Sequence, residues 1–330
     1  MEADENFATP MGGTELMLGR LHASLPRDFL ENFQIIPSKV REELRPDKIR
    51  VFWAHDLAGD PAADGALGGE RWKRFHKIVF VSHWQQWEYV KRYHIPWSRC
   101  AVMQNSIEPI KRKLPWSLAS GRVIEFIYHT TPHRGLSILV PVFEQLAERY
   151  RNIRLSVYSS FKLYAQEKED APFAPLFDRI RSHPSMVYRG AVSNEAVRAA
   201  LALSHVFAYP SIWLETSCLS LIEAMSAGLV CIHPCYGALP ETAANWTSMY
   251  PMDEDLLKHA SLLYAMLDAC IVEIRRGAPT LRTQVAHQKS YADKFYNWQT
   301  RTRQWRALLG SLLGLPRDLP KEPSRWKFPG

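Results

Sequence analysis

The stretch of sequence that decides the fold is Pro210–Gly228, which reads PSIWLETSCLSLIEAMSAG. The residues just before it, 206–209, are apolar and predict a short buried strand. Apolar side chains recur at helical spacing over 219–227, and the glycine that ends the stretch is typical of a helix C-cap. Thr216 and Ser217 lie where the N-cap of this helix is expected. The stretch therefore predicts a strand, a loop and a buried helix in succession.

Two glutamates in this stretch are candidates for binding a ligand. Glu215 falls on the predicted loop, and Glu223 falls inside the predicted helix. A carboxylate in such an apolar helix needs a partner. Vicinal ribose hydroxyls would suit, because a carboxylate accepts from both, and the N–H groups at the helix start suit a phosphate. The alternative is a capped core helix in which Glu223 is ion-paired with a neighbour, and the spacing alone leaves both open.

The letters around the two glutamates resemble a known signature. Glu215, seven further residues and Glu223 are followed by Ala-Met-Ser-Ala-Gly, by a strand-like run at 229–233 and by a GALPE loop at 237–241. This order is similar to the signature of the retaining glycosyltransferases of family 4, a set of group 1 glycosyltransferases that have the GT-B fold. One departure is Cys218, where many members have a glycine. Its amide stays available, but its side chain narrows the room for a phosphate.

The composition is that of a folded protein with one large or two ordinary domains. The 330 residues are 46% hydrophobic and 23% charged, which are globular values. No apolar run reaches the roughly 18 residues that a membrane-spanning helix needs, and the acidic start does not resemble a secretory signal. The 5 scattered cysteines indicate reduced thiols, so we expect a cytoplasmic location.

The net charge of +7 suits an anionic partner. Nucleic acid, an anionic lipid surface and a phosphorylated substrate would each satisfy it. The sequence has no zinc-finger spacing and no glycine-aromatic RNA-binding motif, which argues against nucleic acid. We therefore expect a phosphorylated substrate, and contact with a membrane surface stays open.

A glycine pair opens the first predicted helix. Gly12 and Gly13 precede an apolar helical pattern for which Thr14 is the expected N-cap. Paired glycines let a backbone approach a phosphate closely, although a tight turn is the commoner cause. The pair resembles the glycine-rich loop of the family, which implies a place near the donor phosphates. Family members usually have a strand before this loop, and its apparent lack here predicts a reduced N-terminal domain.

A histidine follows the second predicted strand. Strands are expected at 33–37 and 50–54, and His55 comes directly after the second. Ligands bind at the C-terminal edge of open α/β sheets, although an ordinary loop histidine would give the same pattern. The resemblance implies a cleft histidine close to the reacting sugar. The segment 60–69, rich in Gly, Ala and Asp, predicts a mobile loop.

Further along the chain, a basic residue also follows a predicted strand, as His55 does earlier. Arg134 lies just before Gly135, after a strand expected at 123–128. It resembles the family residue that binds the donor diphosphate, and arginine binds phosphate well through paired hydrogen bonds. A solvated arginine at a helix start is the alternative. The family's second basic residue has only His129 as a counterpart, and the match is poor.

Arg189 follows a strand expected at 186–188. The turn that contains it resembles the base-binding edge of the family, although any strand end looks similar. A helix capped by Asn194 is expected next.

Two groups of metal-binding residue types have simpler explanations. Asp253 and Asp255 precede a long predicted helix, and acidic residues are favoured at a helix start. Cys231, His233 and Cys235 alternate in weak zinc spacing, on a stretch that resembles an ordinary core strand of the family. We therefore expect no metal site.

The alternation of strands and helices predicts an α/β protein with parallel sheets covered on both faces. With the resemblance, we expect two Rossmann-like domains that face a cleft, joined by a linker at 111–120. The N-terminal, acceptor-side domain is expected over 1–115, together with a C-terminal helix over about 298–330. The nucleotide-sugar-binding domain is expected over 116–297.

The resemblance implies transfer of a hexose from a UDP- or GDP-linked donor to a carbohydrate, lipid-linked or other hydroxyl acceptor. It also implies retention of configuration and no need for a metal or other cofactor. Two alternatives stay open. A sugar-nucleotide epimerase of the same fold would convert the donor alone, and a non-catalytic protein would only bind a sugar nucleotide or glycan.

The resemblance also assigns roles to single residues. His55, Arg134 and Glu215 are the expected catalytic residues: Arg134 stabilises the leaving diphosphate and Glu215 orients the sugar hydroxyls. Glu223 is expected to hold the ribose. The other expected donor-binding residues are Gly12, Gly13, Thr216, Ser217, Cys218, Leu219 and Arg189. We expect His55 and Arg134 to meet only when the domains close on the donor.

Overall fold

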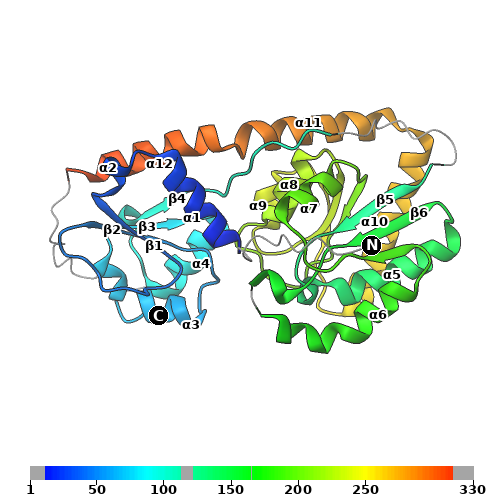
Figure 1. Ribbon diagram of the computed structural model, residues 1–330, viewed down its shortest axis with the longest axis horizontal. Coiled ribbons are helices and arrows are strands. Elements are labelled where there is room, and N and C mark those ends of the chain that lie inside the picture. The colour runs from blue at the N-terminus through cyan, green and yellow to red at the C-terminus, as the bar shows by residue number, and fades with distance from the viewer. Residues whose placement is uncertain (1–11, 113–121, 165, 315–330) are drawn as a thin grey trace. The chain divides into compact units, whose positions relative to one another are not determined.

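The structure, a computed structural model, describes residues 12–112, 122–164 and 166–314. The chain divides into two compact units, whose elements are labelled in Figure 1. Among the described residues, unit 1 takes in Gly12, 107–112, 122–164, 166–214 and Cys218–Asn297, and unit 2 takes in Gly13–Ser106, Glu215–Ser217 and 298–314. The expected linker at 111–120 and the segment that precedes Gly12 fall largely or wholly outside the described residues.

Unit 2 is built on a parallel sheet whose four strands lie in chain order. The strands are β1 (Phe33–Pro37), β2 (Ile49–Trp53), β3 (Lys77–Phe80) and β4 (Cys100–Val102). Ile35 is in register with Val51, and Ile78 is in register with Phe52 and with Cys100. The strands predicted at 33–37 and 50–54 are therefore confirmed to within one residue.

Helices flank this sheet. They are α1 (Gly13–Ser24), α2 (Arg27–Leu30), α3 (Pro61–Leu67), η1 (Arg71–Arg74), α4 (His83–Tyr93), η2 (Trp97–Arg99) and α12 (Trp298–Leu312). In α4, Ser82 is the N-cap and accepts a hydrogen bond from the Gln85 amide at 3.0 Å. The helix then packs Tyr89 against Phe80 of β3, with ring centroids 5.2 Å apart. The helix α12 buries one face, which carries Trp298, Trp305, Leu309 and Leu312.

Unit 1 is built on a six-stranded parallel sheet of order β10-β9-β8-β5-β6-β7. The strands are β5 (Ile124–Tyr128), β6 (Ile153–Val157), β7 (Met186–Tyr188), β8 (Val206–Ala208), β9 (Val230–Cys235) and β10 (Ser248–Pro251). All three residues of β8 are buried, as expected for a central strand covered on both faces. The α/β class with two parallel sheets, predicted from the sequence, is confirmed.

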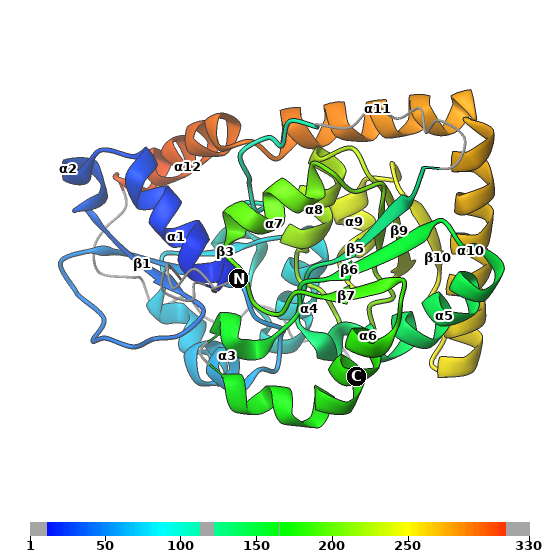
Figure 2. The same ribbon diagram turned by 45° about the vertical axis from the view of Figure 1, so that its right-hand side comes forward.

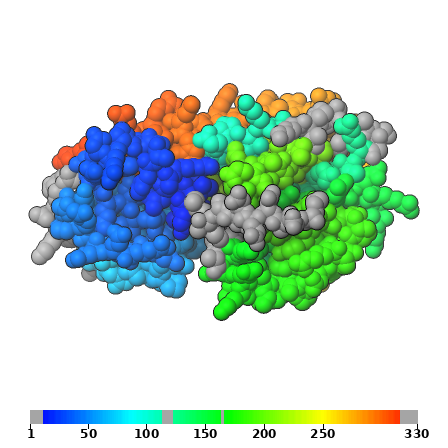
Figure 3. Space-filling model, in the orientation of Figure 1, coloured from blue at the N-terminus to red at the C-terminus, as the bar shows by residue number. Residues whose placement is uncertain are grey.

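Two layers of helices cover the sheet of unit 1. The helices are η3 (Pro132–Arg134), α5 (Leu136–Arg149), η4 (Phe161–Tyr164), η5 (Glu167–Phe173), α6 (Ala174–Ser182), α7 (Asn194–Leu201), α8 (Leu219–Ser226), α9 (Leu239–Ala243), α10 (Leu256–Arg276) and α11 (Pro279–Phe295). Figures 1 and 2 show α5 and α6 on one face of the sheet and α7 and α8 on the other. The segment η5, which buries none of its side chains, lies at the surface of unit 1 (green in Figure 3).

One predicted loop is in fact a helix. The segment 60–69 contains α3, where Asp60 caps the helix by accepting from the Ala62 amide at 2.8 Å. Pro61 takes the first helical position, where its missing N–H costs nothing. Ala63 and Ala66 are buried, so packing in the core stabilises a composition that the sequence analysis assigned to a loop.

Three predicted caps are also wrong. The first helix begins at Gly13, so Thr14 lies inside it. The N-cap of α7 is Ser193, which accepts from the Ala196 amide at 3.2 Å, and Asn194 is the first helical residue. The N-cap of α8 is Cys218, and not Thr216 or Ser217.

Residues of the two groups for which the sequence analysis preferred a structural explanation over metal binding have local structural roles. Asp255 caps α10 and accepts from the amides of Leu257 and Lys258 at 2.9 and 3.4 Å. His233 is buried in β9, where its Nε2 lies 2.8 Å from the Thr247 hydroxyl. Within the described part of the chain, no helix is both long and apolar enough to span a membrane.

Candidate functional site

The sheet of unit 1 reverses its strand order between β5 and β8. The chain runs outward from β5 through β6 to β7, and then returns to place β8 on the other side of β5. In open α/β sheets, ligands bind outside the carboxyl ends of the strands at such a switch point. The candidate site therefore lies where the loops after β5 and β8 come together.

A glycine allows these two loops to touch. Gly135 has φ +106°, and a Cβ built on it would lie 2.0 Å from the Pro210 carbonyl oxygen. No side chain fits there, and a non-glycine residue would also be strained at that φ. Gly135 ends η3 and opens α5, so this close approach fixes where Arg134, the half-buried residue before it, leaves the backbone.

His129 lies at the carboxyl end of β5, beside the same switch point. It is 8% exposed, and neither ring nitrogen has a hydrogen-bond partner among the described residues. Burial lowers the pKa of His129 to about 3, so the ring is neutral at physiological pH. The hydroxyl of Ser220, in the first turn of α8, donates to the His129 carbonyl at 3.0 Å. A buried imidazole with unused nitrogens is available to a ligand at this edge.

The amino end of α8 completes this side of the site. Its N-cap, Cys218, is extended, and its own side chain makes no capping hydrogen bond. The first turn therefore presents backbone N–H groups and the positive end of the helix dipole, which suit a phosphate. The predicted strand, loop and helix are confirmed, and Gly228 has φ +72° just after the helix, as expected for a residue that follows a helix end.

Glu223 lies inside α8 with 7% of its surface exposed. Its Oε1 is 3.3 Å from Nη1 of Arg198 and 3.4 Å from Nδ2 of Asn194, both on α7. The expectation that this carboxylate needs a partner is confirmed. Arg198 is an ion-paired neighbour of the kind that the sequence left open as an alternative, and the role of Glu223 toward ribose stays a prediction.

The three residues before Cys218 group with unit 2. There the Thr216 hydroxyl donates to the His55 carbonyl at 2.7 Å, which explains why Thr216 does not cap α8. Glu215 is 4% exposed in the same segment. The structure therefore brings together Glu215, Thr216 and His55, three residues that the sequence placed in a single site.

His55 follows β2 and packs on Trp53, with ring centroids 4.6 Å apart. Trp53 in turn packs on Trp305 of α12 at 4.7 Å. Burial lowers the pKa of His55 to about 3, and its Nε2 is buried with no hydrogen-bond partner among the described residues. A neutral imidazole can donate or accept one hydrogen bond, but it cannot supply a positive charge.

The remaining predicted site residues are distributed between the two units. Arg134, Arg189, Cys218, Leu219 and Glu223 lie in unit 1 with Gly12, whereas Gly13, His55 and Glu215–Ser217 lie in unit 2. Arg189 follows β7, where its amide donates to the Val157 carbonyl at 2.8 Å. The predicted meeting of His55 with Arg134 concerns residues of different units and stays a prediction.

The sequence analysis did not identify Arg198 and Ser220 as residues of the site, and it considered His129 only as a poor match to the family's second basic residue. One signal was available for Arg198: it follows Asn194 by one helical turn, so both side chains fall on the same face of α7. No sequence signal indicated that this face meets Glu223, because the contact joins two helices that are distant in the chain.

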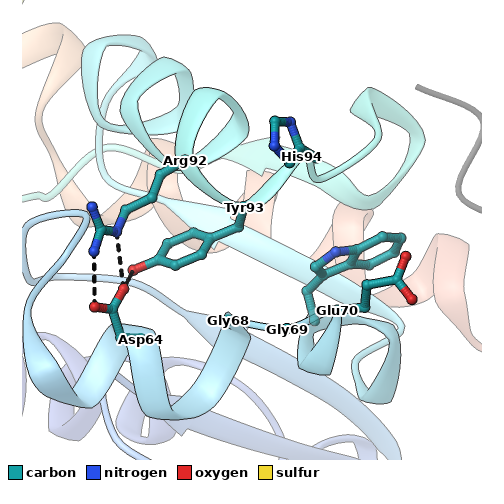
Figure 4. Close-up of a pocket in the computed structure, with 8 residues that line it drawn as sticks. Asp64, Gly68, Gly69, Glu70, Arg92, Tyr93 and His94 are labelled. Carbon is teal, nitrogen blue, oxygen red and sulfur yellow. Dashed lines mark hydrogen bonds and ion pairs between the residues drawn. The ribbon is translucent and has the colours of Figure 1, made fainter. Parts of the chain in front are cut away.

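A separate pocket of about 450 Å³ lies in unit 2, between α3 and the end of α4. Figure 4 shows the guanidinium of Arg92 and the hydroxyl of Tyr93 both directed at the Asp64 carboxylate. These hydrogen bonds lower the pKa of Asp64 to about 2. The polar groups of the pocket thus stabilise the contact between the two helices.

Comparisons with known proteins match this architecture. Residues 111–258 match the family model "Glycosyl transferases group 1". The similarity to this family is thus carried by that part of the chain. The segment contains β5 through β10, the loop that carries Glu215 and the helix that carries Glu223.

A curated relative is a phosphatidylinositol N-acetylglucosaminyltransferase subunit of Arabidopsis thaliana. It is 22% identical over 227 residues, which are 68% of this chain and 46% of the relative. The chain therefore spans about half the length of that relative.

Solved structures share the fold. A glycosyltransferase from Rickettsia africae has TM-score 0.64 at 13% identity, with 95% of this chain and 84% of that chain covered. HepE from Anabaena in complex with UDP-glucose has TM-score 0.64 at 16% identity, with 80% and 73% covered. Sucrose-phosphate synthase from Thermosynechococcus elongatus has TM-score 0.62 at 15% identity, with 80% and 68% covered. The two parallel-sheet units thus match those of GT-B glycosyltransferases.

Proposed function

We propose that the protein is a retaining glycosyltransferase that binds a nucleotide-sugar donor at the switch point of unit 1 and works without a metal. The observation that carries the proposal is the buried Glu223 carboxylate on a helix whose amino end lies beside that switch point. An N–H cluster for a diphosphate and a carboxylate for a ribose are thereby held on one rigid element.

The chemistry needs charge stabilisation at two places. The leaving diphosphate gains negative charge in the transition state, and Arg134 and the α8 amides are suited to bind it. The sugar becomes oxocarbenium-like, and Glu215 would orient its hydroxyls. In this proposal the neutral His55 contacts the sugar or the acceptor by hydrogen bonding and does not act as a cation.

In this proposal, positive groups of the protein stabilise the negative charge of the diphosphate in place of a divalent metal. The fixed cations and helix amides would hold the diphosphate without a bridging ion. Asp253 and Asp255 take no part in this proposal, because Asp255 caps α10 and Asp253 accepts from the Asp255 amide at 2.9 Å.

The relatives support a UDP-linked donor. HepE was solved with UDP-glucose, and the pneumococcal GtfA was solved with UDP and GlcNAc. The name of the Arabidopsis relative couples N-acetylglucosamine transfer to phosphatidylinositol. We therefore propose UDP-N-acetylglucosamine as the first donor to test and a lipid with a hydroxylated headgroup as the first acceptor, at a membrane surface reached from the cytoplasm.

The test is an incubation of the protein with UDP-N-acetylglucosamine, UDP-glucose or GDP-mannose, each with phosphatidylinositol vesicles, with a soluble oligosaccharide or with no acceptor. Products are read by mass spectrometry, with EDTA in half of the reactions. The proposal expects acceptor-dependent release of the nucleoside diphosphate, equal with and without EDTA, and a glycosidic bond of the donor's configuration by NMR.

Other outcomes would replace this proposal. Conversion of the donor with no acceptor present identifies an epimerase. A rise in melting temperature with nucleotide sugar but no product identifies a binding protein. Loss of turnover in EDTA that magnesium or manganese restores would overturn the proposed metal independence.

A further inference from the structure

We propose that Arg198 is a positioning residue for the nucleotide donor. It holds the Glu223 carboxylate against the backbone of the segment Ile107–Ile110, so that the carboxylate meets the ribose hydroxyls in one orientation. The inference rests on the proposed function, since it presumes that Glu223 receives a ribose. It adds a residue that the signature around Glu223 does not contain.

Arg198 forms two sets of contacts with one guanidinium. Nη1 lies 3.3 Å from Oε1 of Glu223, and Nη2 donates to the carbonyl oxygens of Glu108 at 2.7 Å and Pro109 at 3.4 Å. The planar fork of arginine can make both sets at once, whereas a lysine ammonium is a point charge on a flexible stem. The guanidinium therefore connects a ligand-facing carboxylate to a fixed stretch of backbone.

The backbone on the other side of this bridge is itself anchored. The Ile107 amide donates to the Tyr296 carbonyl at 2.7 Å. The Ile110 amide donates to the Ser226 hydroxyl at 2.9 Å, and the Ile110 carbonyl accepts from Lys289 at 2.7 Å. Because Ser226 is the last residue of α8, the segment is attached to the same helix that carries Glu223.

The ion pair of Arg198 and Glu223 is largely buried, which strengthens its effect on the carboxylate. The side chains of Arg198 and Glu223 are 19% and 10% exposed, so little solvent screens them. A guanidinium keeps its charge under all physiological conditions, and a nearby cation favours the ionised form of a carboxylate. An ionised carboxylate only accepts hydrogen bonds, which is the property that recognition of ribose hydroxyls requires.

The competing interpretation is that Arg198 only ties α7 to α8. Both interpretations expect a loss of stability when Arg198 is removed, so stability cannot separate them. They differ in what happens to ribose recognition, because a purely structural contact has no reason to affect one hydroxyl of the ligand more than the rest of it.

The experiment measures the affinity of UDP and of 2′-deoxy-UDP by calorimetry, with GDP and 2′-deoxy-GDP in parallel. The proteins are the parent, Arg198→Met and Arg198→Lys. The control is Arg179→Met, which removes a guanidinium that forms a fork with the Glu144 carboxylate elsewhere in unit 1. Melting temperatures establish that each variant is folded at the temperature of titration.

The parent is expected to favour the ribonucleotide roughly tenfold or more, as for a hydrogen bond to a charged group. Arg198→Met is expected to reduce that preference to below about threefold, a loss of most of that hydrogen bond's selectivity. Arg198→Lys should restore part of the preference, and Arg179→Met should leave it at the parent value.

Two results would overturn the inference, and they are distinguishable. If the parent favours the ribonucleotide and folded Arg198→Met favours it equally, Arg198 is structural and the proposed function still stands. If the parent binds neither UDP nor GDP, the proposed donor site is wrong and the inference falls with it.

Discussion

At the scale of single residues, two of the three candidate catalytic side chains, His55 and Arg134, are suited to different roles. His55 is kept neutral by burial, with its pKa lowered to about 3. Arg134 is positively charged under all physiological conditions and leaves the backbone at a turn fixed by Gly135. The arginine is therefore suited to bind a diphosphate, and the histidine is suited to contact a neutral sugar or acceptor.

This difference predicts two distinct kinetic defects. Arg134→Ala should weaken binding of UDP about tenfold and also slow transfer, by roughly 10²-fold, because a charge donor is lost in both the ground state and the transition state. His55→Ala should slow transfer while the affinity for UDP stays within about twofold of the parent. Calorimetry and steady-state kinetics on both variants check this. The reverse pattern, with nucleotide lost in His55→Ala and only rate lost in Arg134→Ala, would contradict the assigned roles.

At the scale of elements, the site depends on the contact between the loop after β5 and the loop after β8. Gly135 permits this contact because a Cβ there would lie 2.0 Å from the Pro210 carbonyl oxygen. Backbone atoms on both sides leave no flexible side chain to move aside. A substitution at Gly135 must therefore displace the start of α5, the end of β8 or both.

We expect Gly135→Ala to lower the free energy of unfolding by about 2 kcal/mol or more, through the clash and the positive φ together. It should also weaken UDP binding, since Arg134 is adjacent. Urea unfolding and calorimetry measure the two effects.

Gly19→Ala is the matched control. Gly19 lies within α1, where a Cβ would meet nothing within 4 Å, so this change should raise stability by about 0.5–1 kcal/mol. Similar stability of the two alanine variants would show that the loops after β5 and β8 do not need their close approach.

Elements with strong local signals were predictable from the sequence. Periodicity located β1, β7 and α8, because burial on one face of a helix or both faces of a strand leaves a pattern in the chain. The helix α3 was missed because its alanines are stabilised by core packing, which a Gly-, Ala- and Asp-rich composition does not reveal.

The site was predictable in kind but not in its contacts. Burial of Glu223 followed from the apolar helix around it, and the need for a partner followed from burial. The identity of that partner, Arg198 of α7, depends on how two helices pack. Thr216 was misassigned as an N-cap for the same reason, since its hydroxyl bonds to the carbonyl of the distant His55.

At the scale of the whole molecule, buried neutral histidines make stability depend on pH. Burial lowers the pKa of His129 to about 3 and those of His205 and His233 to about 4. Burial is the main cause for His205 and the charge of Arg112 adds to it; the Nδ1 of His205 also accepts from the Glu125 amide at 3.1 Å, which requires that nitrogen to carry no proton. All three histidines lie in unit 1.

These shifts predict acid destabilisation. Between pH 6.5 and 4 the unfolded chain binds protons at these histidines and the folded chain does not, so the free energy of unfolding should fall as the pH falls through this window. The slope should approach about 1.4 kcal/mol per pH unit for each histidine, and stability should level off above pH 7.

Urea unfolding from pH 4 to pH 8 checks this. We expect His205→Gln to reduce the slope of unfolding free energy against pH by about 1.4 kcal/mol per pH unit, the contribution of one histidine. Replacement of the exposed His22 by Gln is the control and should leave the slope unchanged. Stability that rises as the pH falls from 6.5 to 4 would contradict the assignment of neutral, buried imidazoles.

The central claim is that unit 1 holds a nucleotide donor through Glu223, and the most direct measurement is calorimetric binding of UDP and GDP to the parent and to Glu223→Gln. The amide keeps the size of the side chain but loses its charge. We predict that the parent binds one of the two nucleotides and that Glu223→Gln binds it roughly tenfold or more weakly with the fold intact. Glu144→Gln, which also changes a glutamate paired with an arginine in unit 1, should bind like the parent. Equal affinity of the parent and folded Glu223→Gln for the nucleotide would contradict the claim.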